Sequence, residues 1–211
     1  GLKKEVMKVI LNGIDTEAFF PDKNVTTIPF RIVTTASADV PLKGLDYLLE
    51  AFSKVIKTFP ESTLQVIGSS KKGGHTSRKI KDLNIKDKVH FNKDLSFKEV
   101  RDLYCSSDVV VIPSLYEGFG FAIGEAMACR VPVITTTGGA IPEVIGNCGI
   151  TVAPGNSEEL EKAMLKLLPD ENLKKSLAEK GFKRIIEHLQ WKEVAKLMTE
   201  RYEEEIKRMI D

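Results

Sequence analysis

Two glutamates flank a glycine bend in the middle of the chain, where side chains and backbone together could bind a ligand. The segment Ser114–Arg130 reads S-L-Y-E-G-F-G-F-A-I-G-E-A-M-A-C-R, with Glu117 before the glycines Gly118 and Gly120 and Glu125 after them. Free N–H groups and the dipole at a helix start suit a phosphate, and glycine lets the ligand come close. The two carboxylates could then face a sugar and a ribose. On spacing alone, an ordinary charge on a helix surface is the favoured interpretation of Glu125.

The bend belongs to a pattern of strands and helices that repeats along the chain. Apolar runs predict buried strands, and each run is followed by a segment long enough for a helix. Parallel strands need crossovers, so this alternation implies a parallel sheet covered on both faces. We therefore predict an α/β fold with a doubly wound, parallel six-stranded, Rossmann-like sheet. The strands are expected at Phe30–Thr35, Leu64–Gly68, Val89–Asn92, Asp108–Pro113, Val131–Thr135 and Gly149–Ala153.

Such a sheet brings the loops at the carboxyl ends of its strands together at one ligand-binding edge. Ala36–Lys43, Ser114–Gly120 and Thr136–Gly139 are loops of this kind. The glycines of Gly68–Gly74 lack P-loop spacing, so a surface turn is the favoured interpretation there. The glycine bend is thus predicted to lie where ligands bind, which favours a binding role for both glutamates.

Helix signals complete the predicted architecture. Ser96 and Glu99 have the spacing of a capping box. In the last third of the chain, Ser157 is predicted to cap one helix, a second is expected over Leu173–Leu189, and a third begins at Trp191. These extra helices are expected to pack against the sheet.

Composition limits the classes of partner. The 211 residues have a formal net charge of +1, so no overall field favours nucleic acid or an anionic membrane. We expect no signal peptide, and no apolar run approaches the roughly 20 residues of a membrane span. The cysteines are expected to be reduced core residues and the histidines show no ligand spacing, so we expect no metal. These residues are Cys105, Cys129, Cys148, His75, His90 and His188.

Four ordered motifs resemble the glycosyltransferases of group 1, also called family 4. The motifs are Asn12–Pro21 (N-G-I-D-T-E-A-F-F-P), Pro41–Phe52 (P-L-K-G-L-D-Y-L-L-E-A-F), Ser114–Cys129 and Val131–Ile145 (V-P-V-I-T-T-T-G-G-A-I-P-E-V-I). The resemblance runs over nearly the whole chain. It implies a GT-B enzyme with two Rossmann-like domains, retaining transfer of a hexosyl group to an acceptor hydroxyl, a nucleoside diphosphate sugar as donor, and no cofactor or essential metal.

The resemblance implies that this chain is the C-terminal, donor-binding half. Residues 1–22 resemble the interdomain connector, with a short strand expected near Val9–Asn12, and residues 23–190 would form the nucleotide-sugar-binding domain. Residues 191–211 resemble the helix that crosses back to the N-terminal domain. Trp191 and Tyr202 would then either dock on that absent half or belong to the core. A natural chain longer than this one, which begins with Gly1, is the expectation.

The family's functional residues can be transferred one at a time. Glu117 matches the first glutamate of the family's E-x7-E motif, beside the transferred sugar, and Glu125 matches the second, which binds the ribose diol. Lys43 matches the basic residue on the diphosphate, where a cation also stabilises the departing nucleotide. Glu117 and Lys43 are therefore the predicted catalytic pair. The remaining predicted donor contacts are Gly118, Phe119, Gly120, Phe121, Leu95 at the base, Gly138 and Gly139.

The chain departs from the family pattern at three positions. The family usually has an arginine where an ungapped match puts Ala38, which leaves the diphosphate short of a cation. Lys93 replaces a frequent glycine, and we hypothesise that Lys93, or Lys71 or Lys72 nearby, supplies the missing charge. Arg130 stands where a helix-ending glycine is common, and a left-handed backbone there would cost about 1–2 kcal/mol.

Other functions fit less well. A nicotinamide dehydrogenase would need G-x-G-x-x-G after the first strand, and that loop reads A-S-A-D-V-P-L-K-G. An epimerase on a GT-B fold is expected to lack E-G-F-G-F, and a non-catalytic nucleotide-sugar-binding module remains an alternative. We expect a cytoplasmic protein, and its missing domain could place it at the inner face of the membrane. The sequence does not identify the nucleobase, the sugar or the acceptor, which could be a sugar, a lipid-linked compound or a small molecule.

Overall fold

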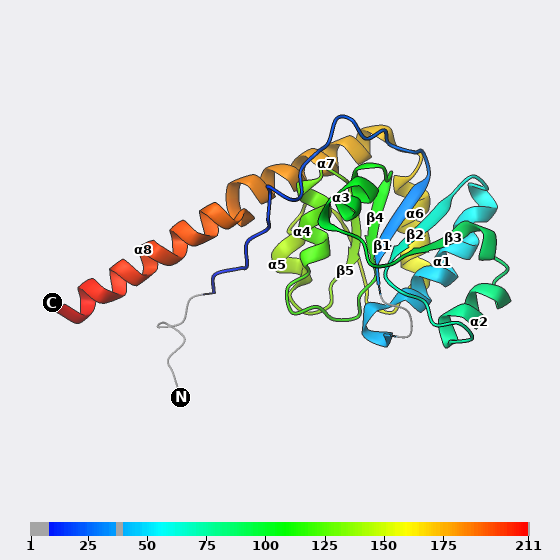
Figure 1. The fold of residues 1–211 in the computed structure, drawn as a ribbon, viewed down its shortest axis with the longest axis horizontal. Coiled ribbons are helices and arrows are strands. Elements are labelled where there is room, and N and C mark those ends of the chain that lie inside the picture. The colour runs from blue at the N-terminus through cyan, green and yellow to red at the C-terminus, as the bar shows by residue number, and fades with distance from the viewer. Residues whose placement is uncertain (1–8, 37–39, 211) are drawn as a thin grey trace.

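The structure is a computed structural model that describes residues 9–36 and 40–210 (Figure 1). Six parallel strands form one sheet in the order β3-β2-β1-β4-β5-β6. The order reverses beside β1, because β2 lies on one side of it and β4 on the other. The strands are β1 (Arg31–Thr35), β2 (Thr63–Ile67), β3 (Val89–Asn92), β4 (Val109–Ile112), β5 (Val133–Thr136) and β6 (Ile150–Val152).

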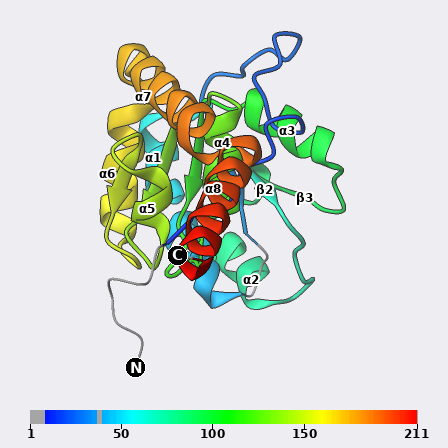
Figure 2. The ribbon, with the colours of Figure 1, turned by 90° about the vertical axis from the view of Figure 1, so that its left-hand side faces the viewer.

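Helices cover both faces of the sheet (Figures 1 and 2). One apolar core lies between the sheet and α1 (Leu45–Thr58), α2 (His75–Asp82) and α6 (Ser157–Leu167). The other lies under α3 (Phe97–Cys105), α4 (Phe121–Ala128) and α5 (Ile141–Ile145). The doubly wound parallel sheet predicted from the sequence is therefore confirmed. α7 (Glu171–Arg184), a π-helical turn (Ile185–Leu189), α8 (Trp191–Ile210) and short 3-10 turns at Pro41–Lys43 and Lys86–Lys88 complete the fold.

Two local predictions were wrong, and one predicted helix reaches its expected end with a change of helix type. α6 is capped by Asn156, whose side chain accepts from the Glu159 N–H, and Ser157 is the first helical residue. Both residue types make good caps, so only the backbone geometry separates them. The helix predicted to run to Leu189 ends its α-helical part at Arg184 and continues as the π-helical turn. The strand expected at Val9–Asn12 is irregular chain instead.

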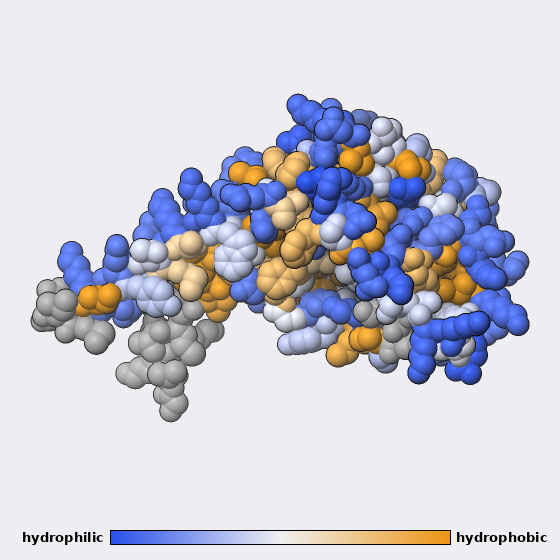
Figure 3. Space-filling view, viewed as in Figure 1, coloured by the Kyte–Doolittle hydropathy of each residue, from blue (hydrophilic) through white to orange (hydrophobic). Residues whose placement is uncertain are grey.

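The connector and α8 are joined just outside the sheet. Ile14 N–H donates to Leu189 O, and Trp191 N–H donates to Ile14 O. A Cβ on Gly13 would approach the Trp191 side chain to 2.6 Å, so glycine permits this contact. Beyond it α8 projects from the domain, and Figure 3 shows apolar side chains along one side of the helix. Its exposed apolar residues are Trp191, Leu197, Met198, Tyr202 and Ile206.

Other expectations concern single residues. Arg130 follows α4 with φ 57°, so it does adopt the left-handed backbone that is costly for a residue other than glycine, and its guanidinium stacks on Phe182. Cys105, Cys129 and Cys148 are free and buried, as predicted. In the part of the chain that the structure describes, no helix is both long enough and apolar enough to span a bilayer.

Candidate functional site

A cavity of about 500 Å³ lies at the point where the strand order reverses. The ends of β1 and β4 contribute Thr35 and Ile112, and the connector contributes Asn12. Ligands bind outside the carboxyl ends of strands at such a switch point. The rest of the lining is Lys43, Glu117, Gly118, Phe119, Gly120, Phe121, Ala122 and Glu125. The structure thus brings seven of the predicted site residues, Lys43 among them, into one cavity.

Lys43 and Glu117 form an ion pair at this cavity. Lys43 Nζ donates to Glu117 Oε1 at 2.8 Å, and Ser114 Oγ donates to the same oxygen at 2.7 Å. The Lys43 side chain is 39% exposed and the Glu117 side chain 18% exposed, so the pair is accessible without being fully hydrated. Sequence reasoning predicted each residue separately and did not predict their contact or the role of Ser114.

Gly44 sets the position of Lys43. It adopts φ 64° between the 3-10 turn Pro41–Lys43 and α1. A Cβ at this position would meet Pro113 O at 2.0 Å, and Leu115 N–H donates to Leu42 O beside it. Glycine both tolerates the left-handed backbone and permits this approach. The start of α1 therefore docks on the end of β4, which carries Lys43 to Glu117.

The N-terminus of α4 faces the same cavity. Gly120 has φ 104° and precedes the helix, and no side chain caps its first turn. Helical N–H groups at such a start are available to an anion, and the dipole favours negative charge. Phe119 is buried and packs edge-on against Phe121, with 4.8 Å between ring centroids. Phe121 itself is 48% exposed at the cavity.

Glu125 lies on the cavity side of α4. Burial raises the pKa of its carboxyl to about 7, and a hydrogen bond from Tyr104 acts in the opposite direction. Tyr104 is fully buried, and its hydroxyl also lies 2.8 Å from Thr35 Oγ1. Sequence reasoning missed Tyr104 and Thr35. Their positions at the end of a helix and of a strand predict only core, so no signal in the sequence singles them out.

The glycines after β5 pack against the loop that carries Glu117. Ala140 N–H donates to Glu117 O, and a Cβ on Gly138 or Gly139 would come within 2.3 Å of a backbone oxygen of Leu115 or Glu117. The N–H of Gly138 donates to Thr136 Oγ1. The two glycines therefore shape the bend, and their contact with a donor stays a prediction.

The predicted residues on other loops lie outside the cavity lining. Lys93 and Leu95 are in the β3–α3 loop, where the Lys93 side chain is 74% exposed and pairs with Asp94 at 3.7 Å. Lys71 and Lys72 are exposed on the loop before α2. Ala38, the position of the missing arginine, lies outside the described residues. Among the residues that are described, no cluster of His, Cys, Asp and Glu could hold a metal ion.

The fold and the cavity together define a doubly wound α/β domain with a polar ligand site at the switch point of its sheet. Its strand order and the uncapped helix start beside a lysine are typical of domains that bind a phosphorylated ligand. Residues 19–184 match the family described as glycosyl transferases group 1. The chain belongs to this family, as its four motifs predicted.

Individual relatives support the same assignment. The chain is 36% identical over 208 residues to the MMP alpha-(1->4)-mannosyltransferase of Mycolicibacterium hassiacum, a match that covers 97% of this chain and 50% of the relative. The chain spans about half the length of the curated relatives it matches.

Two solved structures resemble the fold. The C-terminal domain of the group 1 glycosyl transferase LpcC from Francisella tularensis is 26% identical with a TM-score of 0.74, covering 84% of this chain and 99% of that one. Anabaena Alr3699/HepE, solved with UDP-glucose, is 21% identical with a TM-score of 0.82, and the match covers 97% of this chain and 59% of that one. The fold is thus that of the C-terminal domain of GT-B glycosyltransferases.

Proposed function

We propose that this chain is the donor-binding half of a retaining glycosyltransferase that transfers a hexosyl group from a nucleoside diphosphate sugar to an acceptor hydroxyl. The observation that carries the proposal is the cavity itself, in which Lys43, Glu117, Glu125 and the uncapped start of α4 meet. Family membership and the similarity to a named mannosyltransferase support it. The half-length match supports a second, N-terminal half that would bind the acceptor.

In this proposal the diphosphate lies against the N-terminus of α4 and Lys43. The helix N–H groups of Phe121 and Ala122 supply donors, and the Lys43 ammonium supplies a mobile positive charge. Both would stabilise the charge that develops on the diphosphate as the bond to the anomeric carbon breaks. The acceptor hydroxyl would attack from the face that the nucleotide leaves, so the anomeric configuration is retained.

The carboxylates would recognise the two sugars of the donor. Glu125 would accept hydrogen bonds from the ribose hydroxyls, since an ionised carboxylate is an acceptor with room for two donors. Glu117, which precedes Gly118, would accept from hydroxyls of the transferred hexose. Leu95 and the β3–α3 loop are the proposed contacts of the base. No protein metal ligand is required by this scheme.

The N-terminal half would bind near α8. A second cavity of about 540 Å³ lies between the connector and α8, with Ile10, Leu189 and Leu197 among its lining residues. The exposed apolar side of α8 adjoins it (Figure 3). Closure of the two halves would exclude water and complete the catalytic site.

Isothermal titration calorimetry of this chain with UDP, GDP and ADP tests the first step. We expect one of the three to bind with a dissociation constant below about 1 mM, which corresponds to about 4 kcal/mol. No heat with any of them at millimolar nucleotide would contradict the proposal. A product screen with nucleotide sugars on the full-length protein would then test transfer and the configuration of the new bond.

A further inference from the structure

Asn12 lines the cavity of the proposed donor site (the donor cavity) from the connector rather than from the loops at the sheet edge. The same cavity holds Lys43, Glu117 and Glu125, and the Asn12 side chain is exposed. The motif that begins at Asn12 predicts a connector between two halves and assigns this asparagine no contact with a ligand. Its place in the lining nevertheless puts a polar side chain within reach of whatever fills the cavity.

Other polar side chains of the donor cavity already have partners. Lys43 Nζ donates to Glu117 Oε1 at 2.8 Å, and Thr35 Oγ1 lies 2.8 Å from the hydroxyl of Tyr104. The Asn12 carboxamide, by contrast, forms no hydrogen bond within residues 9–36 and 40–210. A carboxamide has two N–H donors and one oxygen that accepts. All of these groups are therefore available to a ligand in the cavity.

The residue two positions after Asn12 fixes the connector on α4. A Cβ on Gly124 of that helix would lie 2.4 Å from Ile14 Cδ1, so glycine lets the connector pack directly against the helix. Ile14 is buried, and its backbone is hydrogen-bonded at both its N–H and its carbonyl oxygen. The same helix carries Glu125. Asn12 is thus held close to a fixed point on the helix that would bind the ribose.

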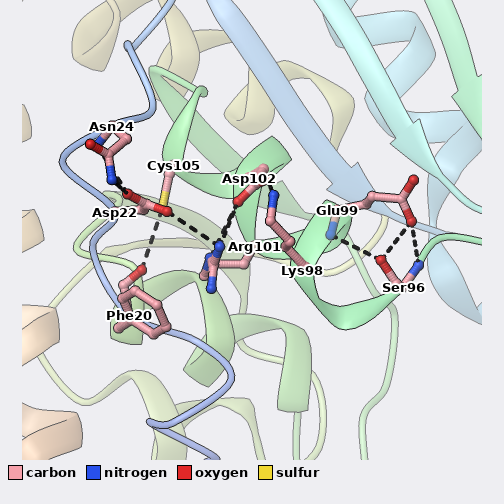
Figure 4. Close-up of polar contacts among 9 residues, drawn as sticks. All are labelled: Phe20, Asp22, Asn24, Ser96, Lys98, Glu99, Arg101, Asp102 and Cys105. Carbon is pink, nitrogen blue, oxygen red and sulfur yellow. Dashed lines mark hydrogen bonds and ion pairs between the residues drawn. The ribbon is translucent and has the colours of Figure 1, made fainter.

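The far end of the connector is anchored on α3. Arg101 pairs with Asp22 at 3.3 Å, and its guanidinium lies 4.3 Å from the centre of the Phe20 ring (Figure 4). Phe19 is buried beside them in the core that α3 and α4 share. The backbone of the connector is therefore in place before a donor arrives. A group that is already positioned costs less entropy when it binds a ligand.

The position of the connector indicates which part of the donor Asn12 would meet. A smaller cavity of about 150 Å³ is lined by Gly13 and Ile14 of the connector, and it shares Phe121 and Glu125 with the donor cavity. The connector therefore borders the donor cavity on its Glu125 side. An ionised carboxylate can only accept, whereas a carboxamide can also donate. One ribose hydroxyl could thus donate to Glu125 and accept from an amide N–H at the same time.

We propose that Asn12 is a donor-binding residue of the connector: its side-chain amide donates to one hydroxyl oxygen of the ribose diol while that hydroxyl donates to Glu125. This inference rests on the proposed function, because the ribose is the group that Glu125 would bind. The contact also ties the connector to the bound nucleotide. Loss of the amide should weaken the binding of a ribonucleotide and spare a form that lacks the contacted hydroxyl.

The test compares wild type with Asn12→Ala. Calorimetry would measure the affinity of the best-binding nucleotide and of its 2′-deoxy and 3′-deoxy forms, with competition against the ribonucleotide where a deoxy form binds weakly. Loss of one neutral hydrogen bond should lower the affinity of the ribonucleotide about 3- to 10-fold. For one of the two deoxy forms, Asn12→Ala and wild type should bind equally well.

Asn24→Ala is the matched control. Asn24 is an exposed asparagine further along the chain whose amide donates to Asp22, and it does not line the donor cavity (Figure 4). Its affinity for all three nucleotides should equal that of wild type. Wild-type affinity in Asn12→Ala, or an equal loss for all three nucleotides, would overturn the inference. If wild type binds no nucleotide at all, the proposed function fails instead.

Asn12→Asp gives a second measurement that does not depend on the deoxy forms. It removes both N–H donors and adds a negative charge to a cavity that already holds Glu117 and Glu125. We expect the affinity of the ribonucleotide to fall more than in Asn12→Ala, by about 10-fold or more. Because the side chain is exposed, the melting temperature should stay within about 2 °C of wild type. Unchanged affinity in Asn12→Asp would show that this side chain does not face the nucleotide.

Discussion

Gly44 provides the sharpest test of how the fold positions the cationic part of the site. Alanine at this position must keep φ near 64°, which costs about 1–2 kcal/mol. Its Cβ would also approach Pro113 O to 2.0 Å, and relieving such a contact costs about 1–3 kcal/mol more. Gly44→Ala should therefore lower the free energy of unfolding by about 2–5 kcal/mol. For a chain of this size the melting temperature should fall by about 10 °C.

The same substitution should weaken nucleotide binding. The backbone shift that relieves the contact moves Lys43, which precedes Gly44 and donates to Glu117 at 2.8 Å. Loss of one hydrogen bond from a charged group lowers affinity by about tenfold or more. Thermal unfolding followed by circular dichroism would measure the stability change, and calorimetry with the best-binding nucleotide would measure the affinity.

Gly155→Ala is the matched control. Gly155 has φ 76°, but the nearest atom to an added Cβ is Tyr47 Cζ at an ordinary 3.5 Å. Gly155→Ala should lower the free energy of unfolding only by the cost of the left-handed backbone, about 1–2 kcal/mol. Its nucleotide affinity should be unchanged. If the two variants lost equal stability, the close approach of Gly44 to β4 would not matter energetically. If Gly44→Ala bound nucleotide like wild type, the docking of Gly44 would not determine the position of Lys43.

Three further predictions concern single charges. Lys43→Ala should lower nucleotide affinity about 10- to 100-fold, measured by calorimetry. A similar fall for Lys93→Ala would show that Lys93 also binds the diphosphate, whereas an unchanged affinity would exclude Lys93 from that role. Lys174→Ala should lower the free energy of unfolding in urea by about 3 kcal/mol, because it leaves the buried Asp108 carboxylate, 2.6 Å from Lys174 Nζ, without its cation. Lys98→Ala, which breaks the exposed pair with Asp102, should lower it by less than about 1 kcal/mol. The pKa of Glu125 is raised from 4.5 to about 7 in the folded chain, so between these pH values the folded chain holds a proton that the unfolded chain has lost. The contribution of this group to stability is therefore complete below about pH 4.5 and is lost as the pH rises through about 7. Thermal melts of Glu125→Gln should lack that part of the decline, and an unchanged pH dependence would contradict the assignment.

The sheet could be predicted because its signal is local. Each predicted strand lies within about two residues of the observed one, since continuous apolar runs such as Val109–Ile112 leave little choice of structure. The sequence marked Arg130 as a helix end where the family often has glycine, but that its backbone is left-handed despite the cost is seen only in the structure. The choice of Asn156 over Ser157 as a cap was not, since both side chains can accept from the first helical turn.

The contacts within the site depend on packing that the sequence does not show. Glu117 and Glu125 could be selected because they flank a glycine bend, yet the burial that raises the pKa of Glu125 depends on how α4 packs in the core that it shares with α3. The ion pair of Lys43 with Glu117 likewise depends on the approach of Gly44 to β4. Residue types and order are thus readable from the sequence, and the distances between elements are not.

The pairing of Lys43 with Glu117 also bears on the missing arginine at position 38. Lys43 is paired with the Glu117 carboxylate, and Ser114 donates to the same carboxylate oxygen. An ammonium has three donors, so Lys43 can turn toward a diphosphate and still donate to Glu117. Ser114 would keep that oxygen hydrogen-bonded during the exchange. We infer that Glu117 keeps the Lys43 ammonium in position until a donor binds, and that the ammonium then binds the diphosphate. The N–H groups at the start of α4 would supply the hydrogen-bond donors that an arginine at position 38 would otherwise provide.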